Sequence, residues 1–129
     1  MRLKIEIDTR LVHPAIWMYL GVIAAEHRLW TREPLVVTEL RRPPTDRPSR
    51  HAPKEDEEVT AADFRRHVLD TLHAADAFCR MIQARWGDEL AVVLEPEWLT
   101  PEELSERGGV LRVDPHVHVQ LRTPDYPGI

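Results

Sequence analysis

Hydrophobic side chains recur along this chain at two spacings, one typical of helices and one typical of strands. Residues 13–30 carry them at helical spacing, and Pro14 suits the first turn of a helix. The same spacing runs from Phe64 to Ile82, so the pattern predicts the clearest helix of the chain over residues 60–86. Short apolar segments, several of them β-branched, predict strands at 2–8, 34–40 and 89–95.

The stretch VDPHVHVQL at 113–121 has a strict alternation of its own. In a strand, alternate side chains share a face. One face would carry His116, His118 and Gln120, and the other would carry Val117, Val119 and Leu121. The apolar face is predicted to be buried, and the opposite face offers two imidazoles. Residues 110–123 therefore predict one or two final strands.

Two long loops separate these elements. Residues 41–59 hold four prolines and a run of acids, a composition that excludes regular structure and is typical of a functional or disordered loop. Residues 96–112 read as an insertion loop with a short helix from Pro101. The order β-α-β-loop-α-β-β shows no internal repeat and predicts a single α+β domain over 1–129.

Charge and composition exclude several classes of protein. The net charge is −5 and no basic stripe is present, which argues against binding to nucleic acid. No stretch is apolar for long enough to span a membrane, and the N-terminus has no secretory signal. We therefore expect synthesis in the cytoplasm, with any release to the cell wall by another route. The single Cys79 excludes an internal disulfide and reads as a small core residue.

The chain contains the ingredients of a catalytic zinc site. Such a site needs three ligands of His, Asp or Glu type, a position for water, and a carboxylate to take the proton of that water. His51 can supply the first ligand, Asp63 or Glu58 the second, and His116 or His118 the third. The alternative interpretations are a solvated His51, exposed strand histidines, and a capping box in which Thr60 and Asp63 begin a helix.

The order of five short motifs gives the chain a resemblance to a known family. The motifs are PLVVTELRR, SRH, AADFRR, ELAVVLE and PHVHVQL, and they span roughly residues 14–122. In this order they resemble the LAS-type zinc peptidases, the group of D-alanyl-D-alanine carboxypeptidases and L-alanyl-D-glutamate endopeptidases. The likeness is greatest to small phage-borne members. The resemblance implies the fold shared with Hedgehog signalling domains, with a small antiparallel sheet and two main helices.

The resemblance also implies roles for individual residues. His51, Asp63 and His118 would bind one zinc ion per chain, and His116 would line the site. Arg42 or Arg41 would hold a substrate carboxylate. The substrate would be the stem peptides of bacterial peptidoglycan.

Two departures from the family pattern leave roles open. The family spaces its first His and its acid seven residues apart, a spacing that points to Glu58, whereas Asp63 lies twelve residues after His51. The general base normally precedes the last ligand by three residues, where this chain has Pro115. Asp114 and Glu95 are the nearest candidates for that base.

Two other functions compete with peptidase activity. A domain of the same fold without catalysis could serve as a structural or binding part of a phage particle, contacting other virion proteins through its loops and through Trp98. The run HVHVQ is also similar to the histidine-triad nucleotide hydrolases and transferases, in which His118 would be the nucleophile. The zinc site requires a metal and the histidine triad does not, so metal content separates the two.

Overall fold

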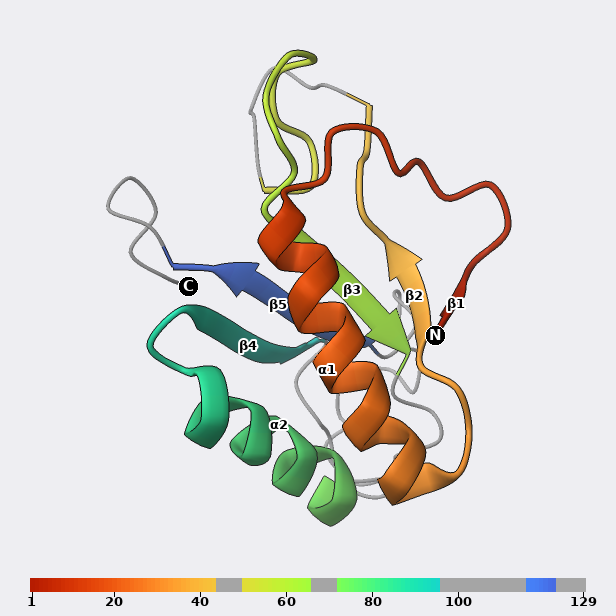
Figure 1. Ribbon diagram of the computed structural model, residues 1–129, viewed down its shortest axis with the longest axis vertical. Helices are drawn as coiled ribbons and strands as arrows, with labels where there is room; N and C mark the ends of the chain where they lie inside the picture. Colours follow the sequence, from red (N-terminus) through yellow and green to blue (C-terminus); the bar gives the residue numbers. More distant parts are fainter. Residues whose placement is uncertain (44–49, 66–71, 96–115, 123–129) are drawn as a thin grey trace, which may run out of the picture.

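A computed structural model describes residues 1–43, 50–65, 72–95 and 116–122 of the chain. Within these ranges the protein is an α+β domain of two helices and a five-stranded mixed sheet (Figure 1). This confirms the predicted class and the two main helices. The elements in chain order are β1 (Arg2–Leu3), α1 (Pro14–Thr31), β2 (Val36–Glu39), β3 (Ala61–Arg65), α2 (Leu72–Trp86), β4 (Leu90–Glu95) and β5 (His116–Leu121).

The sheet has the order β1-β2-β3-β5-β4, so the last strand in the sequence lies between two earlier ones. The pairs β2–β3, β3–β5 and β5–β4 are antiparallel, but β1 runs parallel to β2. The prediction of a purely antiparallel sheet was therefore wrong at this edge. The first strand is also shorter than predicted, because Glu6 adopts a left-handed backbone with φ 66° and Ile5 is 87% exposed.

The helix predicted for residues 60–86 is divided in the structure. Its first part, Ala61–Arg65, is strand β3, and α2 begins only at Leu72. The capping box of Thr60 and Asp63 was therefore wrong. Phe64 fits both patterns, since it lies at helical spacing from later residues and alternates with Asp63 in a strand. The pairing of all five β3 residues with β5 decides in favour of the strand.

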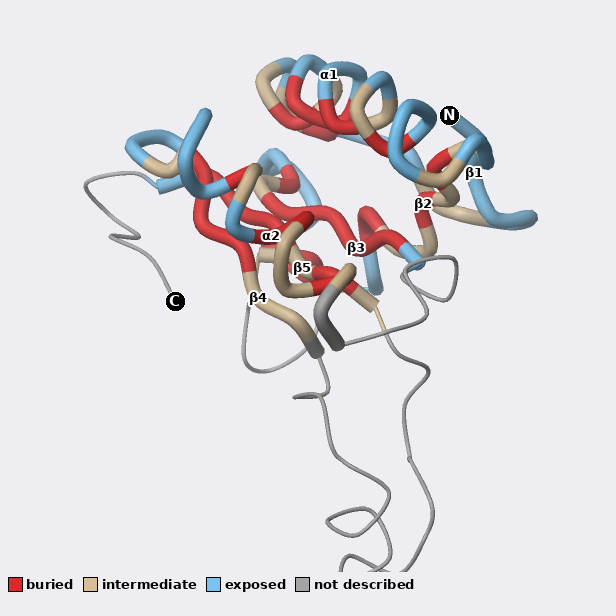
Figure 2. The backbone as a smooth tube through the Cα atoms, turned by 90° about the horizontal axis from the view of Figure 1, so that it is seen from below, coloured by how far each residue is buried: buried red, intermediate tan, exposed pale blue. Residues whose placement is uncertain are grey.

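One face of the sheet carries the hydrophobic core. Buried side chains on this face include Val37, Phe64, Val117 and Val119, and both helices contribute to the same cluster. The predicted alternation of the last strand is confirmed, because its valines are fully buried here. Buried residues follow the strands and the inner side of α1, which lies as an outer layer over the sheet (Figure 2). The opposite sheet face is therefore the one that presents the polar side chains.

Helix α1 begins and ends as local chemistry requires. The side chain of His13 accepts a hydrogen bond from the backbone N–H of Ala15, and Pro14 occupies the first turn. Arg32 ends the helix in a left-handed conformation, at φ 62°. Among the described residues no helix combines the length and apolar character that a membrane span needs. The insertion loop 96–112, with Trp98, lies outside the described residues.

Candidate metal centre

Strands β3 and β5 bring Asp63 and His118 together on the face of the sheet away from the helices. The two residues are direct partners in the antiparallel register, and Arg65 pairs with His116 two positions further along. Residues opposite one another in such a pair have their side chains on the same face, about 5 Å apart at Cβ. The register alone therefore places a carboxylate beside an imidazole.

His51 reaches this pair from the loop that follows β2. Two hydrogen bonds fix its position at the end of that strand. The backbone N–H of Arg42 donates to the carbonyl oxygen of His51 at 2.7 Å, and the His51 ring Nδ1 lies 2.8 Å from the carbonyl oxygen of Leu40. The imidazole is buried, with 3% of the residue exposed. A histidine in a polar loop is thus held as firmly as a core residue.

Arg50 anchors the same loop to the other side of the site. Its guanidinium donates to the Thr60 hydroxyl at 3.1 Å and to the carbonyl oxygen of Leu121 at 2.8 Å. It therefore connects the loop to the start of β3 and to the end of β5. These are the two strands that carry Asp63 and His118.

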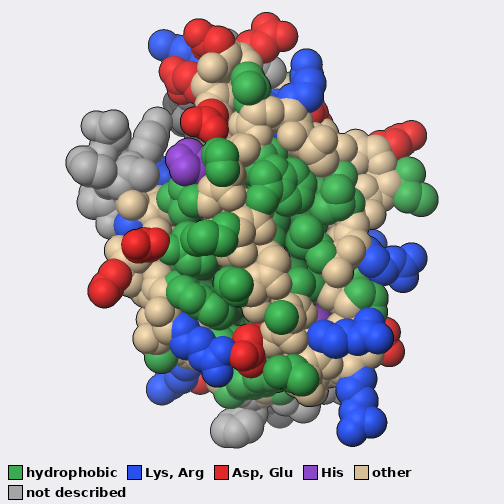
Figure 3. Space-filling view, in the orientation of Figure 1, with side chains coloured by type: hydrophobic (Ala, Val, Ile, Leu, Met, Phe, Trp, Pro, Cys, Tyr) green, Lys and Arg blue, Asp and Glu red, His purple; other side chains and the backbone are tan. Residues whose placement is uncertain are grey.

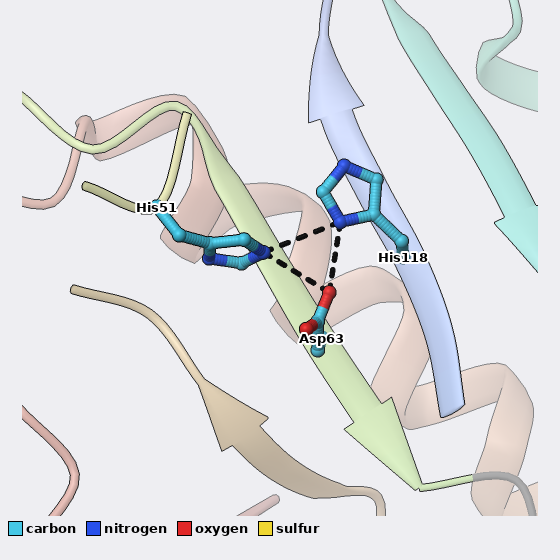
Figure 4. Close-up of side chains that lie close together, drawn as sticks. All are labelled: His51, Asp63 and His118. Atoms are coloured by element: carbon cyan, nitrogen blue, oxygen red, sulfur yellow. Dashed lines mark hydrogen bonds and ion pairs between the residues drawn. The ribbon is translucent and has the colours of Figure 1, made fainter. Parts of the chain in front are cut away.

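Three potential ligand atoms converge at this point (Figure 4). His51 Nε2 lies 3.1 Å from Asp63 Oδ1, and His118 Nδ1 lies 2.8 Å from the same oxygen. The two ring nitrogens are 3.2 Å apart. Each side chain comes from a different segment, namely the loop after β2, strand β3 and strand β5. The buried group of His51, Asp63 and His118 can hold a metal ion.

Hydrogen bonds on the outer side of each ring determine which nitrogen faces the centre. His51 Nδ1 donates to the carbonyl oxygen of Leu40, and His118 Nε2 donates to the side-chain oxygen of Gln120 at 2.8 Å. A neutral imidazole carries one hydrogen, so the inner nitrogens then present lone pairs to one another and to Asp63. Three acceptors this close need positive charge among them, which a metal ion or protonated imidazoles supply. Outer-ring bonds of this kind are typical of metal-binding histidines.

The carboxylate of Asp63 is held in its charged form. In the metal-free protein, where protonated imidazoles supply the positive charge, burial raises the pKa of Asp63, but hydrogen bonds from His118 and His51, and the charges of His51 and His116, outweigh burial and hold the pKa well below its usual value. An ionised carboxylate at neutral pH is the form that binds a cation.

His116 lies at the edge of the cluster. Its Nε2 is 3.6 Å from Asp63 Oδ2. His51 and His118 contact the other carboxylate oxygen, Oδ1. The side chain is 14% exposed. His116 therefore lies beside the second oxygen of the carboxylate, at the edge of the group of His51, Asp63 and His118.

The structure separates the two candidates for the acidic ligand. Glu58 is exposed and is not part of the cluster, whereas Asp63 is buried at its centre. The family interval of seven residues pointed to Glu58 instead of Asp63. It does not apply here because the run KEDEE, residues 54–58, lengthens the segment between His51 and β3. Alternation along β3, rather than distance from His51, directs the carboxylate toward β5.

The two arginines proposed for substrate binding occupy different environments. Arg41 is buried and donates to the carbonyl oxygens of Arg10 and Glu57, so its guanidinium holds two loops together. Arg42 is 52% exposed at its side chain and forms an ion pair with Glu39 at 2.8 Å. Arg42 is thus the more accessible of the pair.

Of the two candidates for a general base, Glu95 lies among the described residues. Asp114 lies outside the described residues. Glu95 ends β4, and its backbone pairs with that of His116. The Glu95 position is therefore in register with His116, two residues along β5 from His118.

Two contributors to the site went unassigned at the sequence level. Gln120 orients His118, and the carbonyl of Leu40 orients His51. Strand alternation had already placed Gln120 on the histidine face, so a signal for its role was present. No sequence signal distinguishes the carbonyl of Leu40, because every residue has one.

Comparisons of the chain with protein-family models, with curated proteins and with solved structures gave no match in any of the three.

Proposed function

We propose that the protein is a zinc-dependent peptidase of bacterial cell-wall peptides, associated with a phage. The observation that carries the proposal is the convergence of His51 Nε2, His118 Nδ1 and Asp63 Oδ1 within 3.2 Å, with both outer ring nitrogens bonded to oxygen. Two imidazoles and one carboxylate form a ligand set that catalytic zinc uses in hydrolases. The proposed substrate comes from the resemblance of the five ordered sequence motifs to LAS-type zinc peptidases.

In this proposal the residues of the chain have separate tasks. His51, His118 and Asp63 hold the zinc, and Leu40 and Gln120 keep the two rings in orientation. Bound zinc would polarise the scissile carbonyl and activate a water molecule. His116, at the rim, would contact the substrate.

Arg42 is the proposed contact for a substrate carboxylate, and it is preferred to Arg41 because it is exposed. A carboxylate of Asp114 or Glu95 would take the proton from the attacking water. A general base has to come within hydrogen-bond reach of that water, so each candidate can be tested by its amide variant.

The histidine-triad alternative is less well supported by the contacts of His118. A nucleophilic imidazole attacks through a ring nitrogen with an available lone pair. Here Nδ1 of His118 contacts Asp63 and His51, and Nε2 contacts Gln120. Both nitrogens are engaged in a way that suits a ligand.

A non-catalytic domain of the same fold remains the second candidate, and Arg41 is the observation that favours it. One of the two arginines expected to bind substrate is instead buried in contacts with backbone carbonyls. In that case the site would hold a metal for stability only, and the protein would serve in a phage particle.

The first experiment is the metal content of the purified protein by mass spectrometry, covering zinc, iron, copper, nickel and manganese. We expect about one zinc per chain, since a single three-ligand group is present among the described residues. The matched variants are Asp63→Asn and Glu58→Gln, which both replace a carboxylate by an amide. Only Asp63→Asn should lose the metal.

The outcomes separate the proposals. Zinc together with cleavage of muropeptides supports the peptidase, and zinc without cleavage supports the structural role. Iron in place of zinc would redirect the search toward oxidative chemistry, since two histidines and one carboxylate also bind iron in oxygenases. No metal after reconstitution would refute both metal-dependent functions.

A further inference from the structure

Helix α1 has a second apolar face, on the side away from the core. Its buried side includes Ile16, Leu20 and Ile23, as expected for a helix packed on a sheet. Its exposed side is also almost free of charge. The exposed residues on that side are Pro14, Met18, Gly21, Val22, Ala25, Arg28 and Leu29.

These exposed positions form one continuous stripe. They recur at intervals of three and four residues, which places them on one flank of a helix. Met18 is 56% exposed, Val22 39% and Leu29 76%. Hydrophobic side chains gather over α1 across this face of the molecule, and charged side chains stand at its rim (Figure 3). A helix that is apolar on both sides is normally covered on both sides.

We infer that this face binds the same face of a second copy of the chain, in an antiparallel helix pair. The stripe is complementary to itself when the two-fold axis passes between Gly21 and Val22. Large residues then lie opposite small or differently shaped ones. The opposed pairs are Pro14 with Leu29, Met18 with Ala25, and Gly21 with Val22.

The small residues near the axis allow the helices to approach closely. A Cβ added to Gly21 would meet no atom within 4 Å, so the space above it is open to a partner side chain. Ala25 offers a shallow position for Met18 of the other copy. The same patch serves on both chains, as a two-fold interface requires.

Charge also favours the antiparallel arrangement. Arg28 is the one charged residue of the stripe. With the axis between residues 21 and 22, Arg28 lies opposite Ala15, so the two arginines are about 20 Å apart. A parallel pair would bring them together, and it would align the two helix dipoles unfavourably.

The available area predicts a weak and reversible dimer. An 18-residue helix is about 27 Å long and about 10–12 Å wide, so one flank covers roughly 300 Å². Leu11 and Trp30, which are 52% and 43% exposed, extend the apolar surface near the two ends of α1. A standard interface needs about 800 Å² per partner, so we expect a dissociation constant of about 10–500 µM.

Sedimentation velocity between roughly 5 and 500 µM tests the inference. The wild type should shift from monomer to dimer. Ala25→Glu should weaken the association at least about tenfold, because it places a charge in the centre of the apolar face. Ala84→Glu is the matched control, since Ala84 is an exposed alanine of α2. A monomer at every concentration would overturn the inference and leave the face to another segment or another protein. Equal effects of the two variants would overturn it as well.

Cysteine cross-linking tests the direction of the pair. Val22→Cys should form a disulfide-linked dimer under mild oxidation, because the two copies of position 22 lie next to the axis. Met18→Cys should not, since its two copies are about 10 Å apart along the helices. Native Cys79 is buried and common to both variants. Equal cross-linking at both positions would refute the antiparallel pairing.

Discussion

In the proposed metal site, the hydrogen bond from His118 to Gln120 would link the strength of metal binding to a residue that does not touch the metal. We propose to replace Gln120 by Leu, which has a similar size and accepts no hydrogen bond. Gln120 is 7% exposed and its oxygen lies 2.8 Å from Nε2 of His118. The variant would leave the outer N–H of a metal ligand without its acceptor in a buried position.

Two estimates give a consistent magnitude for this change. Loss of an outer-sphere partner of a ligating histidine typically lowers metal affinity by about 10–100-fold. This corresponds to about 1.4–2.7 kcal/mol, which agrees with the cost of about 1–3 kcal/mol for leaving a buried polar group unpaired. The assay is competition for zinc against a coloured chelator at fixed pH. Stoichiometry should remain at about one zinc per chain while the affinity falls.

Gln83→Leu is the matched control for this variant. Gln83 is exposed on α2, so the same chemical change should leave zinc affinity within a factor of about two of the wild type. Thermal unfolding of the metal-free proteins shows whether Gln120→Leu is folded. A folded Gln120→Leu protein with wild-type affinity would refute the orienting role of Gln120.

Two further predictions concern the pair Arg41 and Arg42 and the buried Tyr19. Arg41→Ala should lower the free energy of unfolding by about 3 kcal/mol, because it removes charged hydrogen bonds to two carbonyls. Arg42→Ala should cost less than about 1 kcal/mol in the same urea titration, since its ion pair is at the surface, and equal losses would contradict the distinction. Burial and the hydrogen bond with Glu89 raise the pKa of Tyr19 to about 12 from its ordinary value of 10.0. The folded state therefore favours the protonated phenol, so this contribution to stability is complete below pH 10 and is lost as the pH rises toward 12. Phenolate absorbance should show the late titration in the wild type and not in Tyr19→Phe, and a titration of Tyr19 near pH 10 would contradict it.

The elements that sequence reasoning predicted well are those with one dominant pattern. α1 and β4 were located within about one residue, because a long helical period and a short apolar run admit few alternatives. β5 was anticipated from strict alternation, down to the face that carries the histidines. β3 was missed because its apolar residues continue the helical period of α2 backward.

The site was predicted in composition and only partly in arrangement. His51 and His118 were candidates for simple chemical reasons, and the structure brings them together with Asp63. The choice between Asp63 and Glu58 depended on whether residues 61–65 form a strand. The burial of His51 depended on hydrogen bonds between a loop and the end of β2. Both are tertiary facts, because they arise from pairing between segments far apart in the sequence.

The position of β5 has a consequence for how the protein is made. Among the described strands, β3 and β4 do not pair with each other, and β5 pairs with both of them. A nascent chain that has emerged only as far as residue 95 would therefore display two open strand edges, which invite aggregation. Such a fragment should accept a synthetic peptide of residues 113–122 as an inserted strand. Because that peptide carries His118, the ligand set would be completed only at the moment of insertion, and zinc uptake would report it.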